Sequence, residues 1–289
     1  MATTTATAPT PFAREVRRRR ALRRMSQLEL ATLAGTTQRH LSFIESGRSV
    51  PGRAMVVRLS ESLGLTLRER NSMLLSAGYA PAYAESAPES PAVGPAMEAL
   101  RSILTGHLPY PAVVAGPRGE LVLANAAFEV LTEGAAAHLL APPVNVLRLA
   151  LHPEGMAPRV ANLAAWGRHI TEGLRARATA HPDPELDSLI DELAGYLPAA
   201  PPPGPDHLGF AVPLRLRTAG GELRLLTTLT SFATAVDVTL AELHLEAFLP
   251  ADAATAALLH HRRAATPATP QPEPRRGAGP GARGGTGHR

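Results

Sequence analysis

The chain has 289 residues, of which 45% are hydrophobic and 19% carry a formal charge. That length and apolar content suffice for two folded domains and exclude wholesale disorder. Cysteine is absent, which excludes disulfides, thiolate zinc sites and cysteine nucleophiles. Apolar runs of signal-peptide or membrane-spanning kind are also absent from the sequence, so we expect a soluble cytoplasmic protein without a membrane partner.

The charge is distributed unevenly, and all 29 basic residues counted as Lys plus Arg are arginines. Residues 1–80 carry 13 arginines and 5 acidic groups, whereas residues 81–261 carry 10 and 19. The last segment, residues 262–289, carries 6 arginines and 1 acidic group. A basic head on an acidic body is typical of a polyanion-binding domain joined to a domain with another task.

The chain opens with residues 1–10, which are mostly Thr, Ala and Pro and are expected to form a disordered tail. A first helix is then expected from about Phe12 to Arg24, with Val16 among its apolar positions. Its face is unusually basic. Arg19 is expected to pack its stem while its guanidinium reaches solvent or a DNA phosphate.

Residues 26–51 have the pattern of two short helices joined by a tight turn. Ser26 can cap the first helix, whose third residue is Glu29, the pattern of a capping box. Gly35 can end this helix in the left-handed conformation that glycine enters freely. Thr37 is a suitable N-cap for the second helix.

On the second helix, Leu41 and Ile44 give one apolar side while polar residues occupy another. The whole motif closely resembles the Cro/CI-type, or XRE-like, family of helix-turn-helix regulators. The residues that carry this resemblance are Ser26, Gln27, Leu30, Ala31, Gly35, Thr37, Leu41, Ile44, Glu45, Gly47 and Pro51. The alternative is an ordinary antiparallel helix pair, but such a pair requires neither the Ser-Gln start nor the exposed polar set.

Two further helices complete the expected N-terminal domain. Pro51 and Gly52 introduce the fourth helix, and a capping box at Thr66 opens the fifth, which stops at Gly78. Five short helices predict a lambda-repressor-like DNA-binding domain over 11–79. The following stretch, 80–95, contains four prolines and no helical period, which predicts a linker.

Beyond the linker, the pattern changes to mixed α and β. The expected elements are a helix over 96–105, a hairpin over 112–124, a helical middle over 144–197, a hairpin over 212–232 and a third strand over 239–249. For the last of these, a helix starting near Val238 is the alternative. This order predicts an α+β domain over 96–258, a PAS-like antiparallel sheet with helices, followed by a disordered tail over 259–289.

A second resemblance appears in this domain. Together with the N-terminal motif, three segments look like those of the MmyB-type regulators: APPVNVLRLALHPEG at 141–155, VPLRLRTAGGEL at 212–223 and DVTLAELHLEAFLPAD at 237–252. The two resemblances cover about residues 12–258. The second implies that the C-terminal domain binds a fatty acid or a similar acyl ligand.

The resemblance to a helix-turn-helix places the second motif helix in the major groove of double-stranded DNA. The expected base contacts are Gln38, Arg39 and Ser42. The expected phosphate contacts are Gln27, Thr37, Arg48, Arg53 and Arg19. Since one such helix contacts few base pairs, we expect a homodimer on a two-fold symmetric site, located on the nucleoid when bound.

An acyl ligand would need an apolar pocket and a cation for its carboxylate. Arg148 and His152, four residues apart on one helical face, are the first candidates for that cation, ahead of Arg159 and Arg168. Trp166 is a candidate for the pocket lining, although a lone tryptophan among helices more often belongs to a core.

Enzymatic function is not expected. The sequence contains no HExxH, GxSxG or GxxxxGK[ST] motif, and no paired histidines with a carboxylate at ligand spacing. We accordingly expect no catalytic residues, metal site or cofactor other than the acyl ligand. The main alternative is a C-terminal domain that dimerises the DNA-binding domain without any ligand; an enzyme fused to a DNA-binding module is less favoured.

Overall fold

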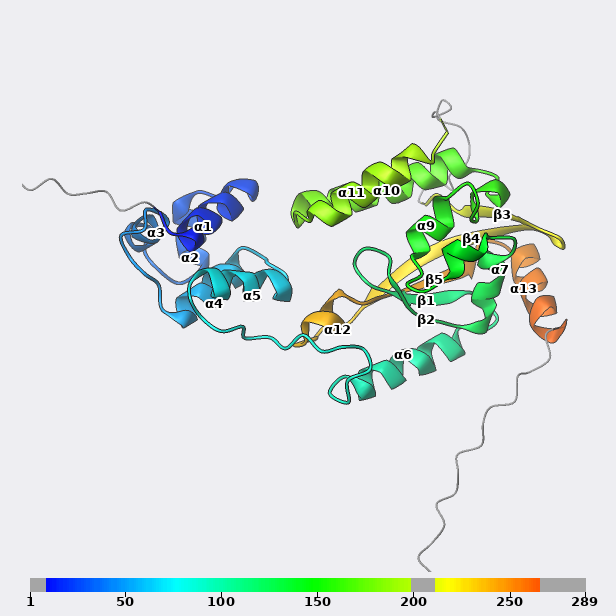
Figure 1. Ribbon diagram of the computed structural model, residues 1–289, viewed down its shortest axis with the longest axis horizontal. Coiled ribbons are helices and arrows are strands. Elements are labelled where there is room, and N and C mark those ends of the chain that lie inside the picture. The colour runs from blue at the N-terminus through cyan, green and yellow to red at the C-terminus, as the bar shows by residue number, and fades with distance from the viewer. Residues whose placement is uncertain (1–8, 199–210, 266–289) are drawn as a thin grey trace, which may run out of the picture.

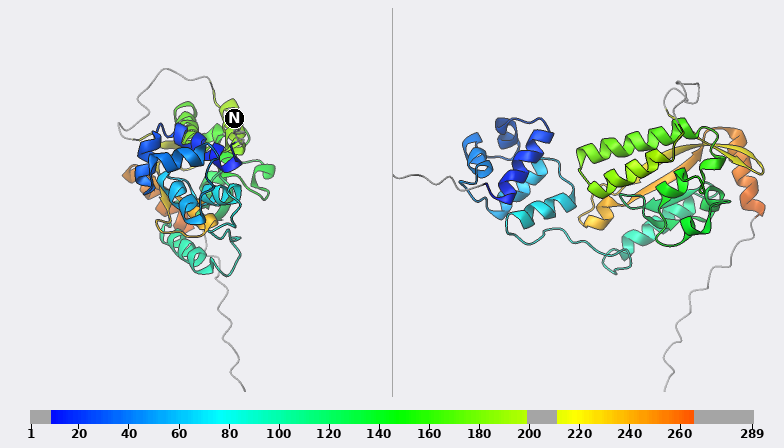
Figure 2. Two further views of the ribbon diagram at one scale, coloured as in Figure 1. Left: turned by 90° about the vertical axis from the view of Figure 1, so that its left-hand side faces the viewer. Right: turned by 45° about the horizontal axis from the view of Figure 1, so that its top comes forward.

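The computed structural model describes residues 9–198 and 211–265, which form two units joined by an extended segment (Figure 1). The first unit is a cluster of five helices. The second is an antiparallel sheet with helices packed on both faces (Figure 2). This architecture confirms the predicted fold class, a lambda-repressor-like helical domain followed by a PAS-like domain.

The helices of the first unit begin where the sequence places their caps. Ser26 and Thr66 each open a complete capping box, in which the hydroxyl accepts from the N–H of Glu29 or Glu69. Thr37 caps the helix between them. The five helices are α1 (Pro11–Leu22), α2 (Gln27–Leu33), α3 (Gln38–Glu45), α4 (Arg53–Ser62) and α5 (Leu67–Ser76).

The turn between α2 and α3 is closed by Gly35, whose φ of 61° lies in the left-handed region that favours glycine. On either side of this turn, Leu30 and Leu41 are 0% exposed and pack into one apolar core with residues of α1, α4 and α5. Burying each such leucine contributes roughly 1.5–3 kcal/mol. The helix-turn-helix is therefore held rigidly by the core beneath it.

The sheet of the second unit has the order β2-β1-β5-β4-β3, and all neighbouring strands are antiparallel. The strands are β1 (Ala112–Ala115), β2 (Leu121–Ala124), β3 (Leu214–Thr218), β4 (Gly221–Ser231) and β5 (His244–Pro250). Both predicted hairpins form, with Val113 opposite Ala124 in one and Leu214 opposite Leu225 in the other. The last strand lies between the two hairpins, which gives the sheet its PAS-like order.

Helices cover both faces of the sheet (Figures 1 and 2). Val114 and Leu245 face a cluster with residues of α6, while Leu214 and Leu225 face a larger cluster with residues of α9, α10 and α11. The helices of this unit are α6 (Gly94–Gly106), η1 (Ala126–Phe128), α7 (Glu129–Thr132), α8 (Ala137–Leu140), α9 (Val146–Leu151), η2 (Ala157–Arg159), α10 (Leu163–Ala180), α11 (Pro184–Gly195), α12 (Val238–Glu242) and α13 (Ala253–Ala265).

Two sequence predictions differ from the structure near the end of this unit. The strand expected over 239–249 is divided, because the Asp237 side chain accepts from the N–H of Leu240 and caps the short helix α12 before β5 begins. The tail expected from residue 259 is helical as far as Ala265, because Asp252 caps α13 and Leu259, 2% exposed, joins the core. Residues 266–289 lie outside the described residues.

The start and the linker also differ slightly from expectation. Of the tail predicted over 1–10, residues 1–8 lie outside the described residues, and Thr10 is the N-cap of α1. The linker ends two residues early, because α6 begins at Gly94 and Val93 is already 3% exposed in the core of the second unit.

Candidate nucleic-acid interface

The outer side of α3 carries the polar residues that are predicted from the sequence to contact bases. Leu41 and Ile44, 0% and 1% exposed, anchor the other side of the helix in the core. Gln38 and Arg39 are exposed in the first turn, and Ser42 is half-buried one turn further on. The Thr37 hydroxyl accepts from the N–H of His40 at 3.1 Å and fixes the start of the helix. The helix therefore presents its N-terminal polar side chains to solvent.

The aromatic ring of Phe43, which was not among the predicted site residues, contacts two of the arginines. The guanidinium carbons of Arg39 and Arg48 lie 5.5 and 6.0 Å from the centroid of the Phe43 ring. Such cation–π contacts are worth about 0.5–1 kcal/mol at exposed sites. Phe43 thereby restrains two cations on one surface. Arg53 is exposed at the start of α4.

Behind this surface lies a buried ion pair. The Glu45 side chain, 4% exposed, accepts from Arg20 Nε and Nη2 at 2.7 and 2.9 Å. Gln27 Nε2 also donates to Glu45, at 2.7 Å. One carboxylate thus joins α1, α2 and α3. Gln27, expected to contact a phosphate, is engaged in this network and would have to exchange Glu45 for the phosphate.

Arg19 does not occupy the position expected of a phosphate contact. Its side chain is 12% exposed and pairs with Glu15 and with Glu69. A hydrogen bond from Arg18, opposed by burial and supported by Arg19, lowers the pKa of Glu15 to about 2. Because its guanidinium is paired with two carboxylates inside the fold, we no longer expect Arg19 to contact a DNA phosphate.

In the second unit, the residues predicted to bind a ligand lie in two environments, the surface around Glu192 and Tyr196 and the apolar core. Arg148 donates to both oxygens of Glu192, at 2.7 and 2.8 Å, on the surface. Trp166, 5% exposed, is part of the apolar core. His152 ends α9, and its ring meets that of Tyr196 edge to face with 4.8 Å between centroids. Arg148 already has its carboxylate, so it is poorly placed to receive one from a ligand.

Arg177 is a cation at the edge of the apolar core that the sequence analysis missed. It lies on α10 between Leu174 and Ala178, both members of that core. It is half-buried and donates to the carbonyl oxygen of Pro117. Burial lowers its pKa, against the opposing effect of nearby carboxylates such as Asp183. The signal in the sequence was its spacing from the apolar positions of a long helix.

Comparison with known proteins agrees with the division of the chain into an N-terminal and a C-terminal domain. A family described as the MmyB-like transcription regulator ligand binding domain matches residues 96–261, and a helix-turn-helix family matches residues 16–70. The chain belongs to the family of MmyB-like transcription regulators. It is a DNA-binding regulator with a ligand-binding domain.

No curated protein matches the regulator. Among solved structures it is similar to an RNA-binding light-oxygen-voltage receptor, with 16% identity over 87% of this chain and a TM-score of 0.27. The match spans 66% of that receptor's chain, just under two thirds of its length. The PAS-like description accordingly rests on the strand order of the sheet. Over the described ranges, no helix combines the length and apolarity needed to cross a membrane.

The two domains of the regulator meet through a polar joint beside α5. Arg68 donates to both oxygens of Glu242 on α12, at 2.7 and 2.9 Å, and also pairs with Glu85 of the linker. The Ser86 N–H donates to Asp237, the residue that caps α12. The DNA-binding domain, the linker and the ligand domain are thus connected by charge-assisted bonds. We call these contacts the α5–α12 joint.

A second contact between the domains centres on Glu69. Its side chain, 13% exposed, accepts from the N–H of Thr66, pairs with Arg19, and lies 2.9 Å from His181 Nδ1 at the end of α10. Burial raises the pKa of Glu69, but the Thr66 bond and the two neighbours together lower it below its usual value. Its contribution to stability is therefore complete above the pKa of an unfolded glutamate and is lost as pH falls through the lower folded value.

The Glu45 network leads to a prediction about stability. Replacing Glu45→Gln is expected to destabilise the N-terminal domain by about 3–5 kcal/mol, because Arg20 then loses its charged partner inside the fold. Hydrogen exchange of the α1–α3 amides, followed by mass spectrometry in the full chain, measures this loss. The control Glu98→Gln, at a side chain 72% exposed on α6, is expected to change nothing in these helices. Equal protection in both variants would contradict the structural role of Glu45.

The α5–α12 joint leads to a second prediction. Glu242→Gln is expected to weaken the joint and so to expose the linker. Cleavage after Glu85 and Glu89 by a glutamate-specific protease is expected to become roughly two- to fivefold faster, the factor that corresponds to the free energy of an exposed ion pair. The matched control is Glu222→Gln, which weakens a comparable pair with Arg215 in the β3–β4 hairpin. Cleavage rates that are the same in the two variants would show that the joint does not hold the linker.

Proposed function

We propose that this regulator binds a specific DNA site as a homodimer, through α3 in the major groove, and that its C-terminal domain senses a small apolar ligand such as a fatty acid. The observation that carries the first part is the capped α3 with Gln38 and Arg39 exposed in its first turn. The family match over 96–261 carries the second. Such a protein acts in the cytoplasm, on the nucleoid.

The proposed base contacts follow from the chemistry of the exposed side chains. A glutamine amide can pair with both N6 and N7 of adenine, and an arginine can pair with O6 and N7 of guanine. We assign these roles to Gln38 and Arg39. Ser42, which has a shorter side chain, is assigned a further contact with a base. Thr37, Arg48 and Arg53 are assigned to phosphates, which set the position of the helix without selecting the sequence.

The homodimer is inferred from what one recognition helix can do. A single such helix contacts few base pairs, and regulators of this architecture commonly place two of them about one helical turn apart on two half-sites. Two copies of the basic N-terminal domain, each with 13 arginines in residues 1–80, also add phosphate contacts. The proposed site is therefore a two-fold symmetric sequence.

The proposed acyl site lies where the apolar core meets Arg177. The core between the sheet and α10 contains Leu174, Leu214 and Leu225, and each buried methylene of a ligand gains about 0.8 kcal/mol in such surroundings. Arg177 is half-buried at the edge of this core and can donate to a carboxylate. This assignment replaces Arg148, which is already paired with Glu192.

The two contacts between the domains support a route for the signal. α10, which carries Arg177, ends at His181 against Glu69 of the DNA-binding domain. A ligand that shifts α10 relative to the sheet would change this contact. The effect on DNA affinity is limited to the difference in ligand affinity between the two arrangements.

DNA contacts are tested on a site selected from random duplexes with the full chain. Gln38→Ala and Arg39→Ala are each expected to weaken binding to that site by about 1–3 kcal/mol, roughly 5- to 150-fold, with a smaller effect on unrelated DNA. Arg101→Ala is the control, because this exposed arginine lies on α6 in the other domain. A footprint covering two symmetric half-sites is expected. Protection of one asymmetric half-site by a monomer would contradict the dimer.

Ligand sensing is tested by titrating the full chain with octanoic, myristic and stearic acid. Binding is expected to appear in native mass spectra and in the fluorescence of Trp166, the one tryptophan of the chain. Arg177→Gln is expected to lower the affinity for the fatty acid about 10- to 100-fold, the factor that corresponds to the free energy of a hydrogen bond to a charged group. The control is Arg175→Gln, which lies exposed on the same helix. If no acid binds and no lipid copurifies, the ligand-free dimerisation domain replaces the sensor.

A further inference from the structure

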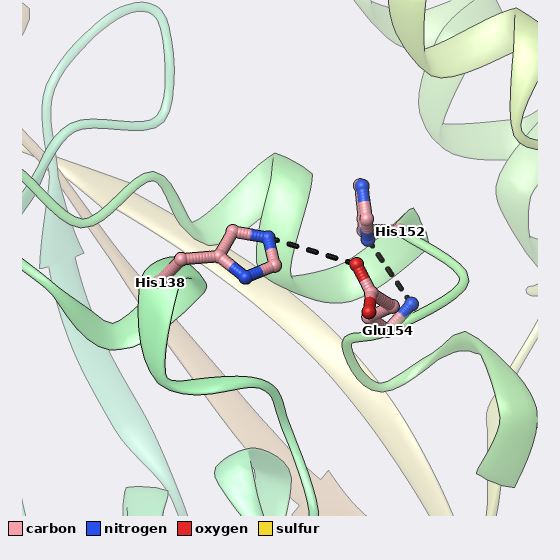
Figure 3. Close-up of side chains that lie close together, drawn as sticks. All are labelled: His138, His152 and Glu154. Carbon is pink, nitrogen blue, oxygen red and sulfur yellow. Dashed lines mark hydrogen bonds and ion pairs between the residues drawn. The ribbon is translucent and has the colours of Figure 1, made fainter.

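Three side chains with metal-ligating atoms gather on the ligand-binding domain (Figure 3). They are His138, His152 and Glu154, and one ligating atom from each lies within 4.8 Å of the other two. His138 Nε2 lies 3.9 Å from a carboxylate oxygen of Glu154. The sequence does not indicate this site, because 14 positions separate the two histidines along the chain.

The backbone around the cluster is firmly held. His138 lies on α8, and the N–H of Ala136, which precedes α8, donates to the Glu154 carbonyl at 2.8 Å. Gly155 allows the tight turn after α9, because a Cβ at this position would lie 2.3 Å from the carbonyl oxygen of Leu149. The two segments that carry the ligands are thereby fixed next to each other.

The hydrogen bonding of His152 defines which nitrogen can bind a cation. Its Nδ1 accepts from the N–H of Glu154 at 3.0 Å, so this nitrogen carries the lone pair. The ring lies edge to face between Tyr196 and His138, with centroid distances of 4.8 and 5.8 Å. Tyr196 is itself held by a hydrogen bond to Glu192. The imidazole is therefore restrained by the two rings that pack against it.

We propose that His138, His152 and Glu154 bind a borderline divalent transition-metal ion, with Zn²⁺ as the representative. Two imidazoles and one carboxylate form a ligand set that zinc accepts, with water in the fourth position. Mg²⁺ and Ca²⁺ require oxygen ligands throughout, so this donor set disfavours them. His152 would offer its Nδ1 lone pair, and the Glu154 N–H that now donates to this nitrogen would lose its acceptor.

For the ion to bind, the Glu154 N–H has to release Nδ1 of His152 and the three side chains have to move closer together. Tetrahedral ligands about 2.1 Å from zinc lie about 3.4 Å apart, closer than the present spread of up to 4.8 Å. The side chains of His138 and Glu154 are 60% and 65% exposed, so they can rotate toward the ion without disturbing the core. The bound ion would link α8 to the turn after α9.

The test is a calorimetric titration of the metal-free full chain with zinc chloride. We expect one tight site per chain, weakened about tenfold or more by His138→Ala and by Glu154→Gln, because even indirect partners of a metal are worth 10- to 100-fold in affinity. His169→Ala is the matched control, since this histidine is exposed on α10 outside the cluster. A second control, His260→Ala with His261→Ala, removes the adjacent pair of exposed histidines on α13.

Cobalt provides an independent readout. Co²⁺ bound by two histidines, one carboxylate and water is expected to give visible absorption bands that His138→Ala abolishes and His169→Ala retains. Failure of the wild-type chain to bind zinc would overturn the proposal. So would binding that persists unchanged in His138→Ala and Glu154→Gln, or that disappears only with the α13 pair. Circular dichroism of each variant verifies that the fold is retained.

Discussion

The carboxylate of Glu69 joins parts of the chain that belong to different domains. It caps α5, pairs with Arg19 of α1, and contacts His181 at the end of α10. Because the group is largely buried, each of these charge interactions is stronger than on the surface, and the loss of one partner affects the others. The end of α10 and two helices of the DNA-binding domain thus share one carboxylate.

The arginines of the N-terminal domain divide into two groups with different tasks. Arg19 and Arg20 are largely buried and paired with Glu69 and Glu45, where they hold α1 to the rest of the domain. Arg39 and Arg48 are exposed near Phe43, and the proposed function assigns them to DNA. The planar guanidinium suits both tasks, since it binds carboxylates and phosphates in the same geometry.

The C-terminal domain separates its apolar and polar features. Its core between the sheet and α10 consists of apolar side chains, and Arg177 is half-buried on α10. The polar side chains around α9 instead form a surface network, in which Arg148 pairs with Glu192 and Tyr196 supports His152. An acyl ligand and a metal ion would thus occupy different parts of the domain, and each would act on the helices that pack over the sheet.

The helix-turn-helix, the PAS-like order of elements and the polar side of α3 could all be predicted from the amino-acid sequence. Caps, helical periods and turn residues are local signals, so Ser26, Thr37 and Gly35 could be interpreted without a structure. Which charged residues form ion pairs became clear only from the folded chain. Arg19 and Arg148 are paired with Glu69 and Glu192, which are distant in sequence, and His138 meets Glu154 only when α8 folds back on the turn after α9. Such pairings depend on which surfaces the core brings together, and no local pattern encodes them.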